Sequence, residues 1–131
     1  DPDMGIYVDI LSESVRTKIA ILWLSLTLAF LAHGQLHFFE KGGVPKETLG
    51  LLLFFDFCYI VPLLLAYLTL ALREKACRTL NIVSPATFLV MNVYHLWAHL
   101  GEPAQIPIVG ATVAIVGLIL WHSLEISKTK R

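Results

Sequence analysis

The sequence predicts an all-α fold class: an integral membrane four-helix bundle that forms a single transmembrane domain over residues 1–131. Apolar residues make up 56% of the chain and its mean hydropathy is +0.71, whereas soluble domains contain roughly 45–50% apolar residues. Four apolar stretches are long enough to cross about 30 Å of hydrocarbon at about 1.5 Å per residue. The connections between them are short, which favours antiparallel neighbours packed in one bundle.

The first apolar stretch covers residues 15–39, after a more polar segment at residues 1–14. We expect that segment to be a capped lead-in, because Ser12 or Ser14 can cap the helix that follows. A short amphipathic helix at the membrane surface is the alternative. The other three predicted helices cover residues 47–72, 76–100 and 105–126.

Basic residues are concentrated at one end of the predicted bundle. They lie before the first helix, between the second and third, and after the fourth: Arg16, Lys18, Arg73, Lys75, Arg78, Lys128, Lys130 and Arg131. The opposite end has only Lys41 and Lys46. The positive-inside rule therefore predicts both termini in the cytoplasm, in a multi-pass protein of a cytoplasmic (inner) membrane. Because these charges flank helices and the formal net charge is zero, no nucleic acid is expected as a partner.

A polar pattern, H-x-x-x-H-x-x-E, occurs twice, each time at the end of an apolar stretch. The two stripes are His33, His37 and Glu40, then His95, His99 and Glu102. Spacings of four and three residues place each set on one helical face. The first and third helices run in the same direction, so the stripes lie at matching depth near the extracytoplasmic face and can converge. Such residues are costly in hydrocarbon, which makes the doubled stripe a predicted functional site.

The stripes predict a transition-metal site. Imidazoles at positions i and i+4 are about 6 Å apart, a geometry in which two histidines bind one ion. The predicted metal ligands are His33, His37, His95 and His99, with Glu40 and Glu102 as oxygen ligands or a second site. The absence of soft ligands favours zinc, iron or copper(II). Haem is the competing cofactor, although one haem would leave half of the stripe unexplained. A hydrated polar cap without any cofactor is the third interpretation.

Asp56 is a lone carboxylate inside the second apolar stretch, at a depth similar to that of His33. Such a group must be protonated, paired or facing water. We predict that it acts as a catalytic base or hydrogen-bonds a ligand histidine. A catalytic base should face an accessible cavity, whereas an accessory subunit would bury Asp56 against a helix. Asn92, one turn before His95 on the same face, is placed to bond to another helix.

Several short features resemble those of the small four-helix bacterial membrane proteins of the DoxX-like kind. They are Arg16 and Trp23, His33-Gly34, the turn Gly43-Val44-Pro45, Asp56, Arg78 and Asn81. The resemblance covers most of residues 16–125 and implies the same four-helix plan. The doubled histidine stripe is not a feature of that group, so the resemblance implies no activity for this chain.

Three functions follow as expectations. An enzyme would use the metal to activate water or oxygen against a lipid-soluble substrate that enters between helices. A non-enzymatic protein would bind a lipid or another lipophilic small molecule, or serve as an accessory subunit in a homo-oligomer or a larger membrane complex. A single-haem electron-transfer protein is the further alternative. Membrane lipid is an expected partner in every case.

Overall fold

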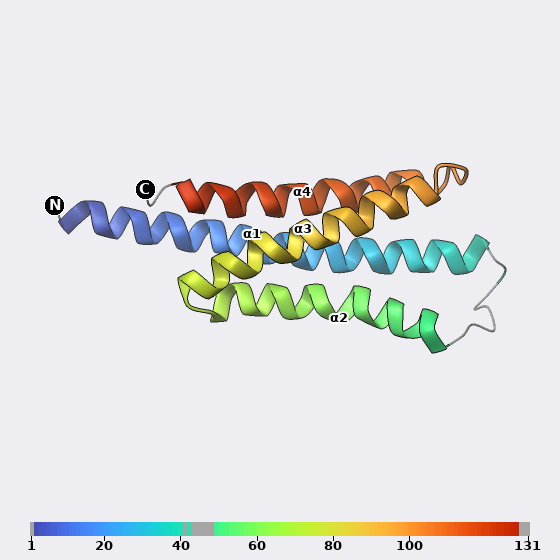
Figure 1. Ribbon diagram of the computed structural model, residues 1–131, viewed down its shortest axis with the longest axis horizontal. Helices are drawn as coiled ribbons and strands as arrows, with labels where there is room; N and C mark the ends of the chain where they lie inside the picture. The colour runs from blue at the N-terminus through green and yellow to red at the C-terminus, as the bar shows by residue number, and fades with distance from the viewer. Residues whose placement is uncertain (1, 41, 43–48, 129–131) are drawn as a thin grey trace.

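The computed structural model describes residues 2–40, 42 and 49–128, and within these ranges it contains only helices and their connections. The four helices are α1 (Pro2–Glu40), α2 (Leu49–Ala71), α3 (Glu74–Ala98) and α4 (Ile106–Lys128) (Figure 1). The all-α, four-helix prediction is confirmed. Among the described residues, three segments are long and apolar enough to cross a membrane, namely Glu13–Glu40, Leu53–Ala71 and Ile106–Glu125. The third helix is not among them, so the predicted span at residues 76–100 is not confirmed as a membrane crossing. This composition is compatible with a membrane protein.

The helices form an up-and-down bundle. α1 and α3 run in one direction and α2 and α4 in the other (Figure 1). α1 packs along both α2 and α4, and α3 packs along α4, whereas α2 and α3 touch over a short length only. α1 and α3 therefore lie diagonally across the bundle, and their side chains meet in its interior. The start of α1, the end of α4 and the α2–α3 connection lie at one end of the bundle, and the α3–α4 connection lies at the other end (Figure 1).

The start of α1 differs from the prediction. The helix begins at Pro2 and continues without a break through residues 12–14, so the expected cap at Ser12 or Ser14 and the separate surface helix are both wrong. Proline is well suited to the first position of a helix, and acidic residues near a helix N-terminus are favoured by its dipole. The 39 residues of α1 extend about 58 Å, well beyond the hydrocarbon thickness of a bilayer.

Trp23 of α1 lies at the centre of the core and is fully buried. Its ring packs edge-on against Phe88 of α3, with ring centroids 5.6 Å apart. Its Nε1 donates to Oδ1 of Asn81 at 2.8 Å, and the hydroxyl of Thr69 on α2 donates to the same oxygen at 3.0 Å. One indole thus connects three helices through packing and a buried hydrogen-bond network.

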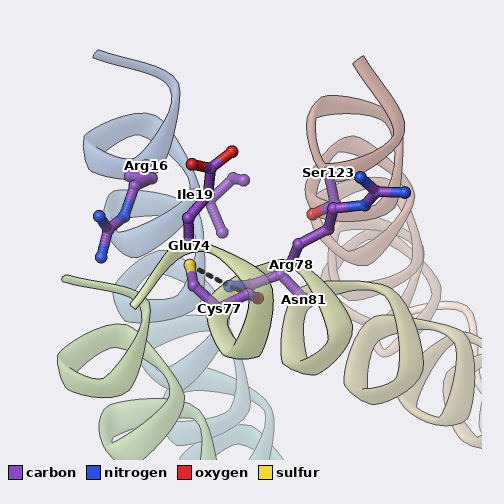
Figure 2. A pocket seen from close by; sticks show the side chains of 7 residues that line it. All are labelled: Arg16, Ile19, Glu74, Cys77, Arg78, Asn81 and Ser123. Carbon is purple, nitrogen blue, oxygen red and sulfur yellow. Dashed lines mark hydrogen bonds between the residues drawn. The ribbon is translucent and has the colours of Figure 1, made fainter. Parts of the chain in front are cut away.

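Arg16 closes the end of the bundle that carries the termini. Its guanidinium satisfies the last carbonyl groups of α2, where a positive charge also complements the helix dipole. These bonds run to the carbonyl oxygens of Thr69, Leu70 and Leu72 at 2.9, 2.9 and 2.7 Å. The neighbouring cavity, lined by Arg16, Cys77, Asn81 and Ser123 among others, has a volume of about 10 Å³ (Figure 2). That space accommodates one water molecule at most, so this end is packed closed.

Candidate metal centre

Three histidines from α1 and from the end of α3 meet at the opposite end of the bundle. Nε2 of His33 lies 2.8 Å from Nε2 of His95, which is hydrogen-bonding distance for two neutral imidazoles. The His99 ring lies 4.4 Å from that of His95 and 5.2 Å from that of His33, measured between centroids. One nitrogen from each of the three lies within 4.8 Å of the others. The two stripes therefore converge, as their placement on parallel helices predicts.

His37 lies at the edge of this group. Its ring centroid is 6.3 Å from that of His33 and 6.4 Å from that of His99. Among the described residues, the group whose nitrogens could share one ion consists of His33, His95 and His99 and does not include His37. The structure thus brings together three of the four histidines expected in one shell.

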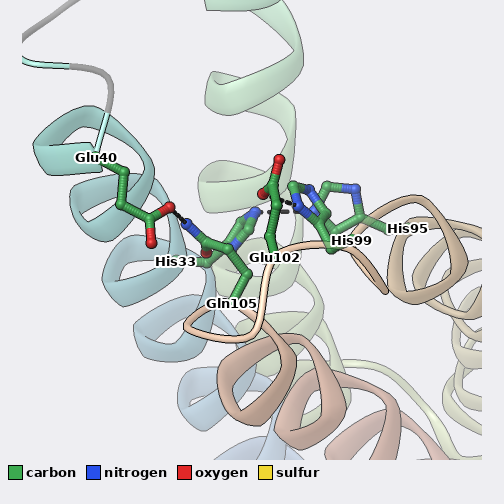
Figure 3. Close-up of polar contacts among 6 residues, drawn as sticks. All are labelled: His33, Glu40, His95, His99, Glu102 and Gln105. Atoms are coloured by element: carbon green, nitrogen blue, oxygen red, sulfur yellow. Dashed lines mark hydrogen bonds and ion pairs between the residues drawn. The ribbon is translucent and has the colours of Figure 1, made fainter.

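Glu102 supports His99. α3 ends at Ala98, and the turn that follows places Oε2 of Glu102 2.6 Å from Nδ1 of His99 (Figure 3). A carboxylate on one ring nitrogen holds the proton there and leaves Nε2 as a free ligand atom. Glu102 therefore lies behind His99, in the position from which a carboxylate commonly orients a metal-binding imidazole.

Gln105 connects the other glutamate to the cluster. Its side chain is fully buried just before α4, lies next to His33, and donates from Nε2 to Oε2 of Glu40 (Figure 3). Nδ1 of His33 and Oε1 of Gln105 are both buried, and neither has a hydrogen-bond partner among the described residues. Glu40 is thus bonded to Gln105, and it does not belong to the group of described residues that could share one ion. Gln105 was not among the site residues predicted from the sequence, although it is the only polar side chain in residues 103–111.

The chemistry of the three histidines fits a first-row divalent ion. A tetrahedral zinc ion binds imidazole nitrogens at about 2.0–2.1 Å, which separates its ligand atoms by about 3.3 Å. Nε2 of His33 and Nε2 of His95, now 2.8 Å apart, need to move apart by only about half an ångström to match that geometry.

Asp56 is placed away from the histidines. Its side chain is exposed on the outer face of α2, in line with the exposed side chains of Ile60, Leu63 and Tyr67. It is absent from the described residues that line the cavity beside the histidines. The expected contact between Asp56 and a ligand histidine is therefore not part of this structure. His122 lies at the other end of the bundle, with Nδ1 3.0 Å from Oε2 of Glu125.

A cavity of about 360 Å³ lies between α2 and α3, and its wall includes His33, His37 and His95. The side of α2 is aromatic, with Phe54, Phe55 and Tyr59, while α3 contributes Met91, Asn92 and Tyr94. Phe54 is 42% exposed and Tyr94 74% exposed. The cavity therefore opens on the outer surface of the bundle, where α2 and α3 diverge, and leads to the histidines.

Asn92 is the most polar group of the cavity wall besides the histidines, and it is 1% exposed. Its Nδ2 donates to the carbonyl oxygen of Phe88 at 2.7 Å, within its own helix. The sequence placed Asn92 for a bond to another helix, whereas the bond in the structure is intrahelical. Its Oδ1 is buried and has no hydrogen-bond partner among the described residues.

No family model, no curated protein and no solved structure matches the chain. The resemblance to the small four-helix membrane proteins of the DoxX-like kind therefore stays a prediction.

Proposed function

We propose that the chain is a multi-pass membrane protein that binds one transition-metal ion through His33, His95 and His99, near its extracytoplasmic face. The observation that carries this proposal is the meeting of three imidazoles, contributed by two diagonal helices, within a largely apolar bundle. Polar side chains are energetically unfavourable at membrane depth, so a cluster of this kind indicates a functional site. Nitrogen ligands supported by a carboxylate behind His99 suit zinc, iron or copper(II).

The proposed ion has three protein ligands and one open position. This arrangement is typical of catalytic zinc, which activates a bound water molecule or polarises a substrate in the fourth position. The cavity between α2 and α3 supports such a role, because it joins the outer surface of the bundle to His33 and His95. We therefore favour an enzyme that acts on a lipid-soluble substrate drawn from the bilayer.

A metal ion is favoured over haem by the contact between His33 and His95. A bis-histidine haem places its macrocycle between the two axial nitrogens. Here these nitrogens are in direct contact at 2.8 Å. Haem binding would thus require α1 and α3 to move apart, whereas a single ion requires only small side-chain rotations.

An accessory subunit is the second candidate function, and the position of Asp56 favours it. A carboxylate on the outer face of α2, among exposed apolar side chains, is costly in contact with lipid. A neighbouring membrane helix that offers a hydrogen-bond donor would remove that cost. In this role the chain docks through α2 on another copy of itself or on a larger membrane complex.

Metal titration of the purified protein tests the first proposal. We expect one zinc ion per chain and an affinity that falls at acidic pH, because a protonated imidazole cannot coordinate. Calorimetric titration at several pH values, with elemental analysis of the product, measures both quantities. If neither zinc, iron nor copper binds stoichiometrically, the metal proposal is wrong and a hydrated polar cap replaces it.

Cysteine labelling tests the membrane orientation. Gly101 lies in the α3–α4 connection and Lys75 lies near the start of α3, and both positions are exposed. The native cysteines, Cys58 and Cys77, are buried and contribute little background. With cytoplasmic termini, an impermeant maleimide should label Gly101→Cys from outside and Lys75→Cys from the cytoplasm. Labelling of both positions from the same side would contradict the proposed orientation.

A further inference from the structure

We propose that the cavity between α2 and α3 binds an apolar phenol whose hydroxyl group donates a hydrogen bond to Oδ1 of Asn92. This inference names the substrate class of the proposed metal site and rests on that function for its chemistry. The binding itself depends only on the cavity, so it can be measured in protein from which metal has been removed.

The hydrogen bonding of Asn92 indicates that the ligand must be a hydrogen-bond donor. The carbonyl oxygen of Phe88 can only accept, so the partner 2.7 Å away must be the amide nitrogen of Asn92. The other end of the side chain is then the amide oxygen, a buried acceptor to which no described residue donates. A ligand that fits this site must supply a hydrogen. A hydroxyl group does so, whereas a ketone, an ether or an ester does not.

The apolar part of the ligand is indicated by the cavity wall. Tyr59 and Phe55 on α2 are stacked, with ring planes 18° apart and centroids separated by 6.2 Å, and both rings line the cavity. Gly34 of α1 faces Tyr59, and a Cβ at that position would collide with its hydroxyl group. A volume of about 360 Å³ is near the lower end of the range for ligand pockets, about 300–1,000 Å³. One aromatic ring fits this space, with a short alkyl tail directed past Phe54 and Tyr94.

In the proposed complex, the phenol oxygen lies near His33 and His95. Asn92 is three residues before His95, on the same face of α3, and both side chains line the cavity. A hydroxyl bonded to Asn92 therefore lies on the route from the outer surface of the bundle to the open position of the metal. Asn92 is a substrate-positioning residue in this scheme.

A matched pair of probes tests the hydrogen bond. We expect 4-pentylphenol to bind the metal-free protein in lipid nanodiscs about tenfold more tightly than 4-pentylanisole, its methyl ether. The reason is that the phenol gains a hydrogen bond to the buried acceptor, whereas the ether leaves that acceptor unpaired, as it is in the ligand-free protein. Equilibrium dialysis, with empty nanodiscs to correct for partitioning, measures the ratio. Equal affinities for phenol and ether would overturn the proposal.

Two variants locate the site. Asn92→Leu should reduce the affinity ratio to about one, because the acceptor is gone, whereas Thr87→Leu, at an exposed position of α3 outside the cavity, should keep the wild-type ratio. Gly34→Ala should weaken both probes equally, since the added Cβ would displace the hydroxyl end of Tyr59, a residue of the cavity wall. A preference for the phenol that survives in Asn92→Leu, or unchanged affinities in Gly34→Ala, would place the ligand elsewhere.

The result separates the two proposals. A phenol preference that depends on Asn92 in a protein that binds no metal leaves this inference standing and removes the metal function. Stoichiometric metal binding with equal affinity for phenol and ether leaves the metal site standing and removes the phenol.

Discussion

Replacing His95 with alanine is expected to weaken zinc binding by about a hundredfold or more. His95 contacts His33 through its Nε2 and lies nearest to the His99 ring, so it is central to the cluster. An ion that loses one of three protein ligands must recruit water in its place, and even supporting residues behind a ligand contribute about 10–100-fold to affinity. Competition with a chelator of known affinity measures the loss.

The remaining polar residues should follow a graded order. Glu102→Gln should weaken binding by about 10–100-fold, because the amide orients His99 less strongly than the carboxylate does. His37→Ala should have a smaller effect, since His37 lies outside the group of three. His122→Ala is the control at the opposite end of the bundle and should leave the affinity unchanged. A loss in His37→Ala as large as that in His95→Ala would show that all four histidines coordinate.

Replacing Trp23 with alanine is expected to destabilise the fold by about 3–5 kcal/mol, the usual cost of a large-to-small change at a packed aromatic site. The substitution removes the edge-on contact with Phe88 and the hydrogen bond to Asn81. Trp23→Phe keeps most of the packing and loses the hydrogen bond, so it should cost about 1 kcal/mol. Unfolding in mixed micelles of increasing denaturing-detergent content, followed by circular dichroism, measures these differences.

Trp121 provides the matched control for Trp23. It is 63% exposed and its Nε1 donates to Glu125 on the same helix at 2.9 Å. Trp121→Ala should therefore change the free energy of unfolding by less than about 1 kcal/mol. Equal losses in Trp23→Ala and Trp121→Ala would contradict the assignment of Trp23 to the centre of the core.

The sequence predicted the helices and the histidine cluster because both depend on periodic patterns. Long apolar runs located α2, α3 and α4 to within two residues at each end. The spacing of His33 and of His95 within their stripes fixed a helical face, and parallel helix directions brought the two faces to one depth. These inferences required only the geometry of the helix and the alternation of the spans.

Other features depend on packing that a single sequence does not reveal. α2 is apolar on every side, so its composition gave no indication that Asp56 faces outward. Gln105 is one polar residue at a helix start, and its link to Glu40 exists only after α4 has packed against α1. Serine occurs both in caps and within helices, which is why Ser12 and Ser14 indicated a helix start that α1 does not have.

The diagonal placement of α1 and α3 has a consequence for assembly. In chain order the protein consists of two helical hairpins, α1 with α2 and α3 with α4. The first hairpin contributes His33 and the second contributes His95 and His99, so neither contains the cluster alone. An ion that binds only when the hairpins have docked stabilises the docked state by mass action. The metal affinity and the free energy of association of the two hairpins are therefore linked. A substitution that weakens the docking of the hairpins should also weaken metal binding.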